Sequence, residues 1–271
     1  MNDTANQVPS NPNDASVPNR KVVLLGASNV VIAWRTIFAL IRTRVASPVE
    51  IWGAFGHGRS YGVRSRVLGR ALPGITECGL WQSLERSRSG DISAIITDLG
   101  NDLMYSLDVR QIMDWVTWCV EHLRARNTAI VVTRLPIASV RALSPSRFRL
   151  MRSLLFPRSQ MSLAIAIGLA EELDAQVVEL AAAFGIPAVE TKPEWYGFDP
   201  IHILSRERKS AWSEILGYCL TPGAGDASSQ RQPRCPTLWR LAPERRWLLG
   251  VEQTRAQPAC VMDDGTQIHL F

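Results

Sequence analysis

Short apolar runs alternate along this chain with segments whose apolar residues recur at helical spacing. Residues 21–26 form a continuous apolar run, which is typical of a strand buried on both faces. Val30, Trp34 and Ile37 then recur every three or four positions, so a helix is predicted directly after this strand. The pattern repeats, which predicts an α/β fold with a mostly parallel sheet covered by helices on both faces.

The remaining predicted elements follow the same alternation. Further strands are expected at 49–55, 91–99, 128–133 and 186–190, and helices around 112–123, at 144–156, at 160–184 and up to about residue 219. These strands and helices make up one predicted domain, residues 21–220.

Both ends of the chain differ from this domain in composition. Residues 1–20 are rich in Asn, Pro, Asp and Ser and lack an apolar h-region, so we expect a disordered leader and no signal peptide. Residues 221–234 are rich in Gly, Ser, Gln, Pro and Arg, which is typical of a linker. In the C-terminal extension, residues 235–271, the Asp264-Gly265 pair between apolar flanks predicts a β-hairpin.

Composition narrows the classes of protein that fit. The chain is 46% hydrophobic and 20% charged, as in globular proteins, and no apolar run reaches the roughly 18 residues of an integral membrane segment. Its five cysteines are scattered, without a Cys-x-x-Cys pair, which favours a cytoplasmic location. Its four histidines lack metal-ligand spacing, so neither a metal nor a cofactor is predicted.

The net charge is +5, and nearly all of the basic residues are arginines. One cluster contains no intervening acid and comprises Arg141, Arg147, Arg149, Arg152 and Arg158. It is either a solvated helix face or a surface that attracts acidic substrates or membrane headgroups. This signal does not predict nucleic acid as a partner.

Candidate chemistry lies just after the predicted strands. Ser28, the glycine-rich segment 56–62, Asn101 and the Asp199-Pro-Ile-His202 turn each follow a strand. Because ligands bind beyond the carboxyl ends of parallel strands, all four can meet at one edge of the sheet.

These side chains match the requirements of acyl transfer. Ser28 can attack a carbonyl if a base accepts its proton, and an imidazole such as His202 titrates in the range suited to that task. Asp199 lies three residues before His202, so its carboxylate can orient the ring across one turn.

Four blocks, Gly26-Ala-Ser-Asn29, the loop around Gly58, Gly100-Asn101-Asp102 and Asp199-Pro-Ile-His202, resemble in this order the SGNH (GDSL-type) hydrolase family of esterases, lipases and acyl transferases. The resemblance covers residues 21–219. It implies a three-layer, flavodoxin-like fold, a small-molecule acyl ester substrate and an acyl-enzyme on Ser28 with His202 as base. It also implies an oxyanion hole formed by the backbone N–H groups of Ser28 and Gly58 and the side chain of Asn101, with Gly56 as an alternative to Gly58.

One residue departs from the family pattern. Ala27 occupies the position at which the family usually has an aspartate that helps to shape the nucleophile turn. The three triad residues are unaffected by this change. Tyr61, Tyr105 and Trp195 flank the blocks and are candidate substrate-binding residues.

Other interpretations fit less well. An α/β-hydrolase nucleophile elbow needs glycine where Val30 stands, and neither Gly-x-Gly-x-x-Gly nor a P-loop follows the first strand. The same catalytic residues could serve an acyltransferase, and an SGNH scaffold could also bind a ligand without turning it over.

Overall fold

The computed structural model describes residues 20–87, 90–155, 160–220 and 234–271. The predicted leader (except for residue 20) and the predicted linker (except for residue 234) lie outside these ranges.

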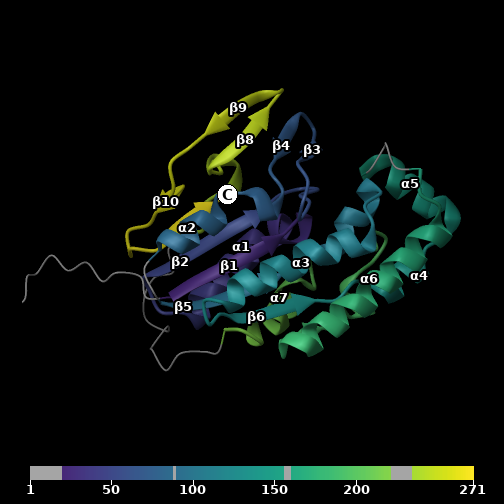
Figure 1. Cartoon of the computed structure of the whole chain (residues 1–271), viewed down its shortest axis with the longest axis horizontal. Helices are drawn as coiled ribbons and strands as arrows, with labels where there is room; N and C mark the ends of the chain where they lie inside the picture. Colours follow the sequence, from purple (N-terminus) through teal and green to yellow (C-terminus); the bar gives the residue numbers. More distant parts are fainter. Residues whose placement is uncertain (1–19, 88–89, 156–159, 221–233) are drawn as a thin grey trace, which may run out of the picture.

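Among the described residues a seven-stranded sheet forms the centre of the molecule (Figure 1). Its strands, in spatial order, are β10 (Cys260–Val261), β11 (Gln267–Leu270), β2 (Val49–Phe55), β1 (Arg20–Gly26), β5 (Asp91–Ile96), β6 (Ala129–Thr133) and β7 (Ala188–Val189). All neighbouring strands are parallel except β10 and β11. The predicted α/β fold is confirmed.

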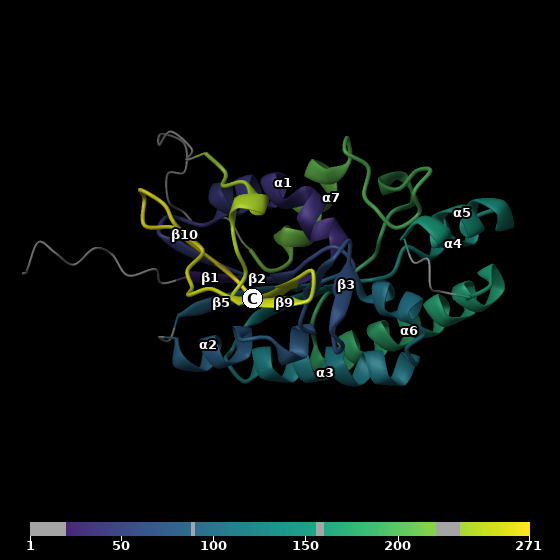
Figure 2. The ribbon, with the colours of Figure 1, turned by 90° about the horizontal axis from the view of Figure 1, so that it is seen from above.

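Helices cover both faces of this sheet (Figure 2). One face carries α1 (Ser28–Arg44) and α7 (Arg208–Gly217), and the other carries α2 (Leu80–Arg86), α3 (Val109–Arg124) and α6 (Leu163–Phe184). Alternate residues of β1 pack against the two helix layers. Val22 and Leu24 pack with α1 and α7, whereas Val23 and Leu25 pack with α2, α3 and α6. This alternation explains why β1 is apolar throughout.

Two short helices, α4 (Ile137–Arg141) and α5 (Pro145–Leu155), lie beside α6 beyond the end of β6 (Figure 1). Short 3-10 helices complete the helical segments: η1 (Ile75–Glu77), η2 (Leu99–Tyr105), η3 (Pro193–Trp195) and η4 (Leu238–Arg240). The turn η2 follows β5 directly and therefore carries Asn101 at the carboxyl edge of the sheet.

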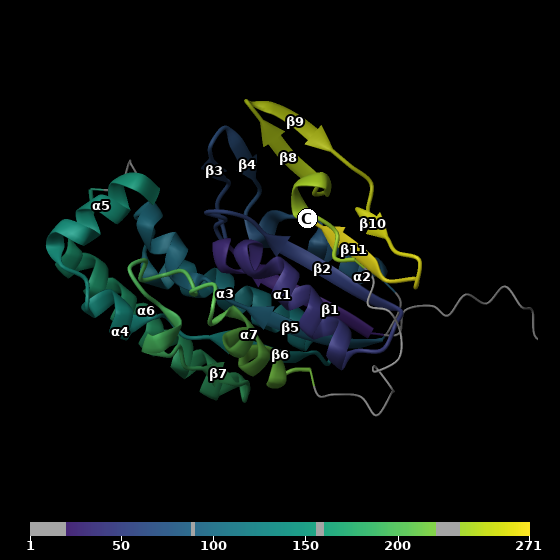
Figure 3. The ribbon, with the colours of Figure 1, turned by 180° about the vertical axis from the view of Figure 1, so that it is seen from behind.

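The C-terminal segment is part of the main sheet. Strands β10 and β11 pair antiparallel around Asp264-Gly265, and β11 then pairs parallel with β2. The last residue, Phe271, is buried, and its carbonyl accepts a hydrogen bond from Arg59. Figure 3 shows this segment next to β2, at the edge of the sheet opposite to β7.

A second, antiparallel sheet projects beside the first (Figure 1). It comprises β3 (Ser65–Val67), β4 (Arg70–Leu72), β8 (Arg245–Leu248) and β9 (Val251–Thr254), in that order. Because β3 and β4 follow the loop that contains Gly58 while β8 and β9 come from the C-terminal segment, this sheet links the chain terminus to the predicted oxyanion loop.

Candidate active site

Ser28, His202 and Asp199 are joined by consecutive hydrogen bonds. The Oγ of Ser28 lies 2.7 Å from Nε2 of His202, and Nδ1 of His202 lies 2.6 Å from Oδ2 of Asp199. With the Nδ1–H donated to Asp199, Nε2 is the acceptor that faces the Ser28 hydroxyl. The two sequence segments, 174 positions apart, therefore meet at the carboxyl edge of the sheet.

The Asp199 carboxylate is also held by its own backbone turn. Its Oδ1 accepts hydrogen bonds from the amides of Ile201, at 3.1 Å, and His202, at 3.3 Å. Burial raises the pKa of Asp199, but the hydrogen bonds and the nearby imidazole outweigh burial and leave that pKa below its ordinary value. The carboxylate is therefore charged at neutral pH and can stabilise an imidazolium.

Ser28 is the first residue of α1, and the Asp98 carboxylate holds the turn around it. Oδ2 of Asp98 accepts hydrogen bonds from the backbone amides of Ala27, at 2.7 Å, and Asn29, at 3.1 Å. Amides in the first turn of a helix lack intrahelical partners, and negative charge there also favours the helix dipole. Asp98 therefore fixes the backbone on both sides of Ser28.

The Asn29 side chain connects this turn to the loop that carries His202. Its Nδ2 donates to Oδ1 of Asp98 and to the carbonyl of Ile201, both at 2.8 Å, and its Oδ1 accepts from the amide of Ile203 at 2.9 Å. Asn29 thus contacts the residues immediately before and after His202. One side chain therefore connects the turn of Ser28 to the loop of His202.

Asp98 and Asn29 were not among the residues predicted from the sequence. Asp98 comes at the end of β5 with a left-handed backbone (φ +63°) and lies against the turn that contains Ala27. Burial raises its pKa above the ordinary value, and the hydrogen bonds from Asn29 and Ala27 offset part of that effect. The Asp98 carboxylate therefore lies beside Ser28, although the residue before Ser28 in the sequence is Ala27 and not an aspartate.

The predicted oxyanion loop contains both candidate glycines, Gly56 and Gly58. Gly58 has φ +62°, a left-handed conformation that favours glycine, and it is partly exposed, whereas Gly56 is buried and its carbonyl accepts from the amide of Arg59. Nδ2 of Asn101 donates to the carbonyl of Arg59 at 3.0 Å, which fixes the Asn101 amide against this loop. Of the two glycines, Gly58 is therefore the one with solvent exposure and a left-handed backbone.

The three aromatic residues predicted for substrate binding have different surroundings. Trp195 is buried and lines a cavity next to Ser28. Tyr61 is buried and does not line this cavity; its hydroxyl donates to the carbonyl of Thr97. The Tyr105 hydroxyl donates to the carbonyl of Gly58 and is likewise outside the lining, so it supports the loop that contains Gly58.

Asp102, the last residue of the third block, is fully buried. Its Oδ2 accepts a hydrogen bond from the amide of Tyr61 at 2.8 Å. Burial raises its pKa to about 6, and the hydrogen bonds it accepts lower that pKa only in part. Asp102 therefore joins η2 to the loop that contains Gly58 and Tyr61, and it does not line the cavity.

Three arginines of the cluster make contacts within the chain. Arg141 pairs with Glu171, Arg152 donates to the carbonyl of Met161, and Arg147 donates to the carbonyls of Gly197 and Phe198. These contacts fix α4 and α5 against α6 and against the segment that precedes Asp199. Arg158 lies outside the described residues.

Within the described ranges, no group of three or more His, Cys, Asp or Glu side chains is arranged to hold a metal ion. None of the helices in this part of the chain is both long and apolar enough to cross a membrane.

At the sequence level, no protein-family model and no curated protein matches this chain. Solved structures do resemble it. A carbohydrate acetylesterase from Sinorhizobium meliloti has a TM-score of 0.52 and 15% identity over 73% of this chain and 97% of that one. An aryl esterase from M. smegmatis has a TM-score of 0.48 and 14% identity over 74% and 100% of the two chains. A lipolytic G-D-S-L family protein from Veillonella parvula has a TM-score of 0.45 and 10% identity over 73% and 97%.

The acetylesterase match spans nearly the whole of that protein, and its fold is shared with the described core of this chain. The resemblance that rests on four short sequence blocks is therefore confirmed at the level of the three-dimensional fold. This chain has the fold of the SGNH (GDSL-type) hydrolases.

Proposed function

We propose that this protein is a serine esterase or deacylase that hydrolyses a small acyl ester through an acyl-enzyme on Ser28. The observation that carries the proposal is the hydrogen-bonded row of Ser28, His202 and Asp199, with 2.7 Å and 2.6 Å between the successive side chains. These are the separations that a nucleophile, its base and an orienting carboxylate require.

In the first half of the reaction, Oγ of Ser28 forms a bond to the ester carbonyl carbon while Nε2 of His202 accepts the hydroxyl proton. Asp199 stabilises the resulting imidazolium. When the tetrahedral intermediate collapses, the bond to the alkoxy group breaks and His202 donates its proton to the departing alcohol. The acyl group remains on Ser28.

In the second half, water takes the place of the alcohol. Nε2 of His202 accepts a proton from the water as its oxygen attacks the acyl carbon, and the proton then returns to Oγ of Ser28 as the carboxylic acid departs. Both halves develop negative charge on the carbonyl oxygen. The backbone amides of Ser28 and Gly58 and the Asn101 side chain are the proposed donors to that oxygen, and losing one such donor typically lowers kcat by about 10²–10³.

Hydrolysis of p-nitrophenyl esters tests this function. Wild-type protein is expected to release p-nitrophenol, whereas Ser28→Ala should lower kcat by about 10³ or more with an unchanged circular dichroism spectrum. The carboxylic acid should be the product without an added acceptor. Activity that survives in Ser28→Ala would contradict the proposal.

A further inference from the structure

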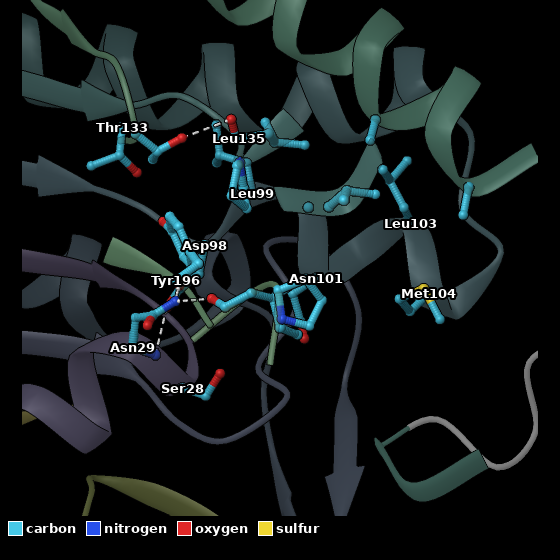
Figure 4. A pocket seen from close by; sticks show the side chains of 18 of the residues that line it. Ser28, Asn29, Asp98, Leu99, Asn101, Leu103, Met104, Thr133, Leu135 and Tyr196 are labelled. Carbon is cyan, nitrogen blue, oxygen red and sulfur yellow. Dashed lines mark hydrogen bonds between the residues drawn. The ribbon is translucent and has the colours of Figure 1, made fainter. Parts of the chain in front are cut away.

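A cavity of about 150 Å³ extends from Ser28 into the region beneath α4, α5 and α6. Figure 4 shows Ser28 and Asn101 at one part of its wall and Leu103, Met104 and Leu135 at another. Ser28, the proposed nucleophile, and Asn101, a proposed oxyanion donor, both belong to the wall of this cavity. A group bound there would therefore be attached to the reacting carbonyl.

Apolar side chains dominate the far part of the cavity. Phe148 lines it from α5, and Leu143 lines it from the turn before α5. Ala166 and Ala170 line it from α6. Two arginines also contribute to the wall: Arg134 pairs with Asp174, and Arg152 donates through Nη1 to the carbonyl of Met161, while its Nε is buried without a hydrogen-bond partner among the described residues. This lining suits a hydrocarbon group better than a sugar.

The far wall is a small apolar cluster separate from the two main cores. Its buried members are Leu143, Phe148 and Ala166. Ala166 and Ala170 are four residues apart and therefore lie on the same face of α6, where their small side chains leave room beside Phe148. The length of the cavity depends on these two alanines.

We propose that this cavity is the acyl-binding site and that it selects acyl groups of about four to eight carbons. This inference rests on the proposed esterase function. A cavity of about 150 Å³ lined by apolar side chains holds benzene, so the same volume accommodates about six carbon atoms. An acetyl group would leave most of it unfilled, and a long fatty chain would exceed it.

A series of p-nitrophenyl esters from acetate to palmitate measures this selection. Up to the capacity of the cavity, kcat/KM should rise about fourfold per methylene, since each methylene leaves water for an apolar surface. The maximum is expected near hexanoate, with a fall of at least about tenfold by laurate. A profile that is flat, or highest at acetate or palmitate, would overturn the inference.

Ala166→Leu adds side-chain volume inside the cavity and should lower kcat/KM for hexanoate at least about tenfold while leaving acetate within about twofold. Ala164→Leu is the matched control, because Ala164 is on the same helix but exposed, and it should leave the whole profile unchanged. Phe148→Ala removes volume and should move the maximum to longer chains. Equal effects of the two leucine variants would contradict the assigned wall.

Failure of this inference is distinguishable from failure of the proposed function. Ser28-dependent hydrolysis with a profile that Ala166→Leu does not alter would refute the acyl site and leave the esterase in place. If no ester is hydrolysed, calorimetric titration with sodium hexanoate still tests the cavity: wild type and Ala164→Leu should bind it, and Ala166→Leu should bind at least about tenfold more weakly. Equal or absent binding in all three would refute the site.

Discussion

Asp98 accepts hydrogen bonds from both the backbone amide and the side-chain amide of Asn29, the residue that follows Ser28. Asn29 in turn contacts the residues on either side of His202. Through these bonds the Asp98–Asn29 pair connects the end of β5, the start of α1 and the loop of the proposed base. The pair is placed to hold Ser28 and His202 at reacting distance.

Replacing Asp98 with asparagine tests this positioning role. The change keeps the side-chain shape but removes the charge and one acceptor, so the amides around Ser28 lose part of their support. We expect kcat to fall by about 10–100-fold with KM nearly unchanged, because small displacements of reacting groups have effects of that order. Steady-state kinetics on hexanoate and acetate esters measures the changes in kcat and in KM separately.

Asp108→Asn is the control for this experiment. Asp108 caps α3 by accepting from the amide of Arg110, so it also supports a helix start, but it is exposed and away from the triad. It should lower thermal stability slightly and leave kcat unchanged. If Asp98→Asn lowers stability and spares kcat, Asp98 has only a structural role.

Gly58→Ala should impair the proposed oxyanion hole. A Cβ at this position would lie 2.7 Å from Cγ2 of Val67 and 2.9 Å from the Tyr105 hydroxyl, and alanine disfavours φ +62°. We expect the loop to shift and kcat to fall by about 10²–10³, the loss typical of one missing donor. Gly185→Ala is a matched control, since Gly185 has φ +63° with no atom within 4 Å of the added Cβ. Similar kcat values for the two variants would argue against Gly58 as a donor.

Asp102 makes stability depend on pH. Its pKa is about 6 in the folded chain and 3.8 ordinarily, so between these values the folded state binds more protons than the unfolded state. The contribution of this group to stability therefore falls as pH rises from about 4 to 6, by about 3 kcal/mol at most.

Asp102→Asn removes this titration while retaining an oxygen that can accept from the amide of Tyr61. Relative to wild type, the free energy of unfolding of the variant should increase by about 2 kcal/mol between pH 4.5 and 7.5. Urea unfolding at the two pH values measures the change. A constant difference between the proteins would show that Asp102 does not titrate in this window.

Leu68 turns the chain between β3 and β4 with φ +48° while its side chain is fully exposed. A left-handed backbone is unfavourable for leucine and better tolerated by asparagine. Leu68→Asn should therefore stabilise the protein by about 0.5–1 kcal/mol, as measured by thermal unfolding. Leu150→Asn, at an exposed position within α5, should instead be destabilising by a few tenths of a kcal/mol. Destabilisation by both changes would refute this account of Leu68.

The sequence predicted β1, β2, β5, β6 and β7 and the longer helices, because strongly apolar β1 and amphipathic α3 show their burial in local periodicity. The short elements α2, α4, β3 and β4 were not predicted. The sequence also singled out Ser28, Asp199 and His202, whose chemistry and spacing are visible in short segments. The part played by Asp98 was not visible, because its partner amides lie about 70 positions earlier and depend on the pairing of β1 with β5.

The cavity and the C-terminal strand were hidden for the same reason. Ala166 and Phe148 are ordinary helix residues in sequence, and only the packing of α5 on α6 places them in one wall. Strand β11 has a local hairpin signal at Asp264-Gly265, but nothing near it in sequence indicates that it pairs with β2. Contacts between distant segments determine both features.

The account depends most on Ser28 as the nucleophile, and covalent labelling tests that claim directly. The protein is treated with a fluorophosphonate, which transfers its phosphonyl group to an activated serine with loss of fluoride, and the adduct is located by peptide mass spectrometry. We predict one adduct per chain, on the peptide that contains Ser28, and none in Ser28→Ala. An adduct on another residue, or a wild-type protein that remains unlabelled, would contradict the account.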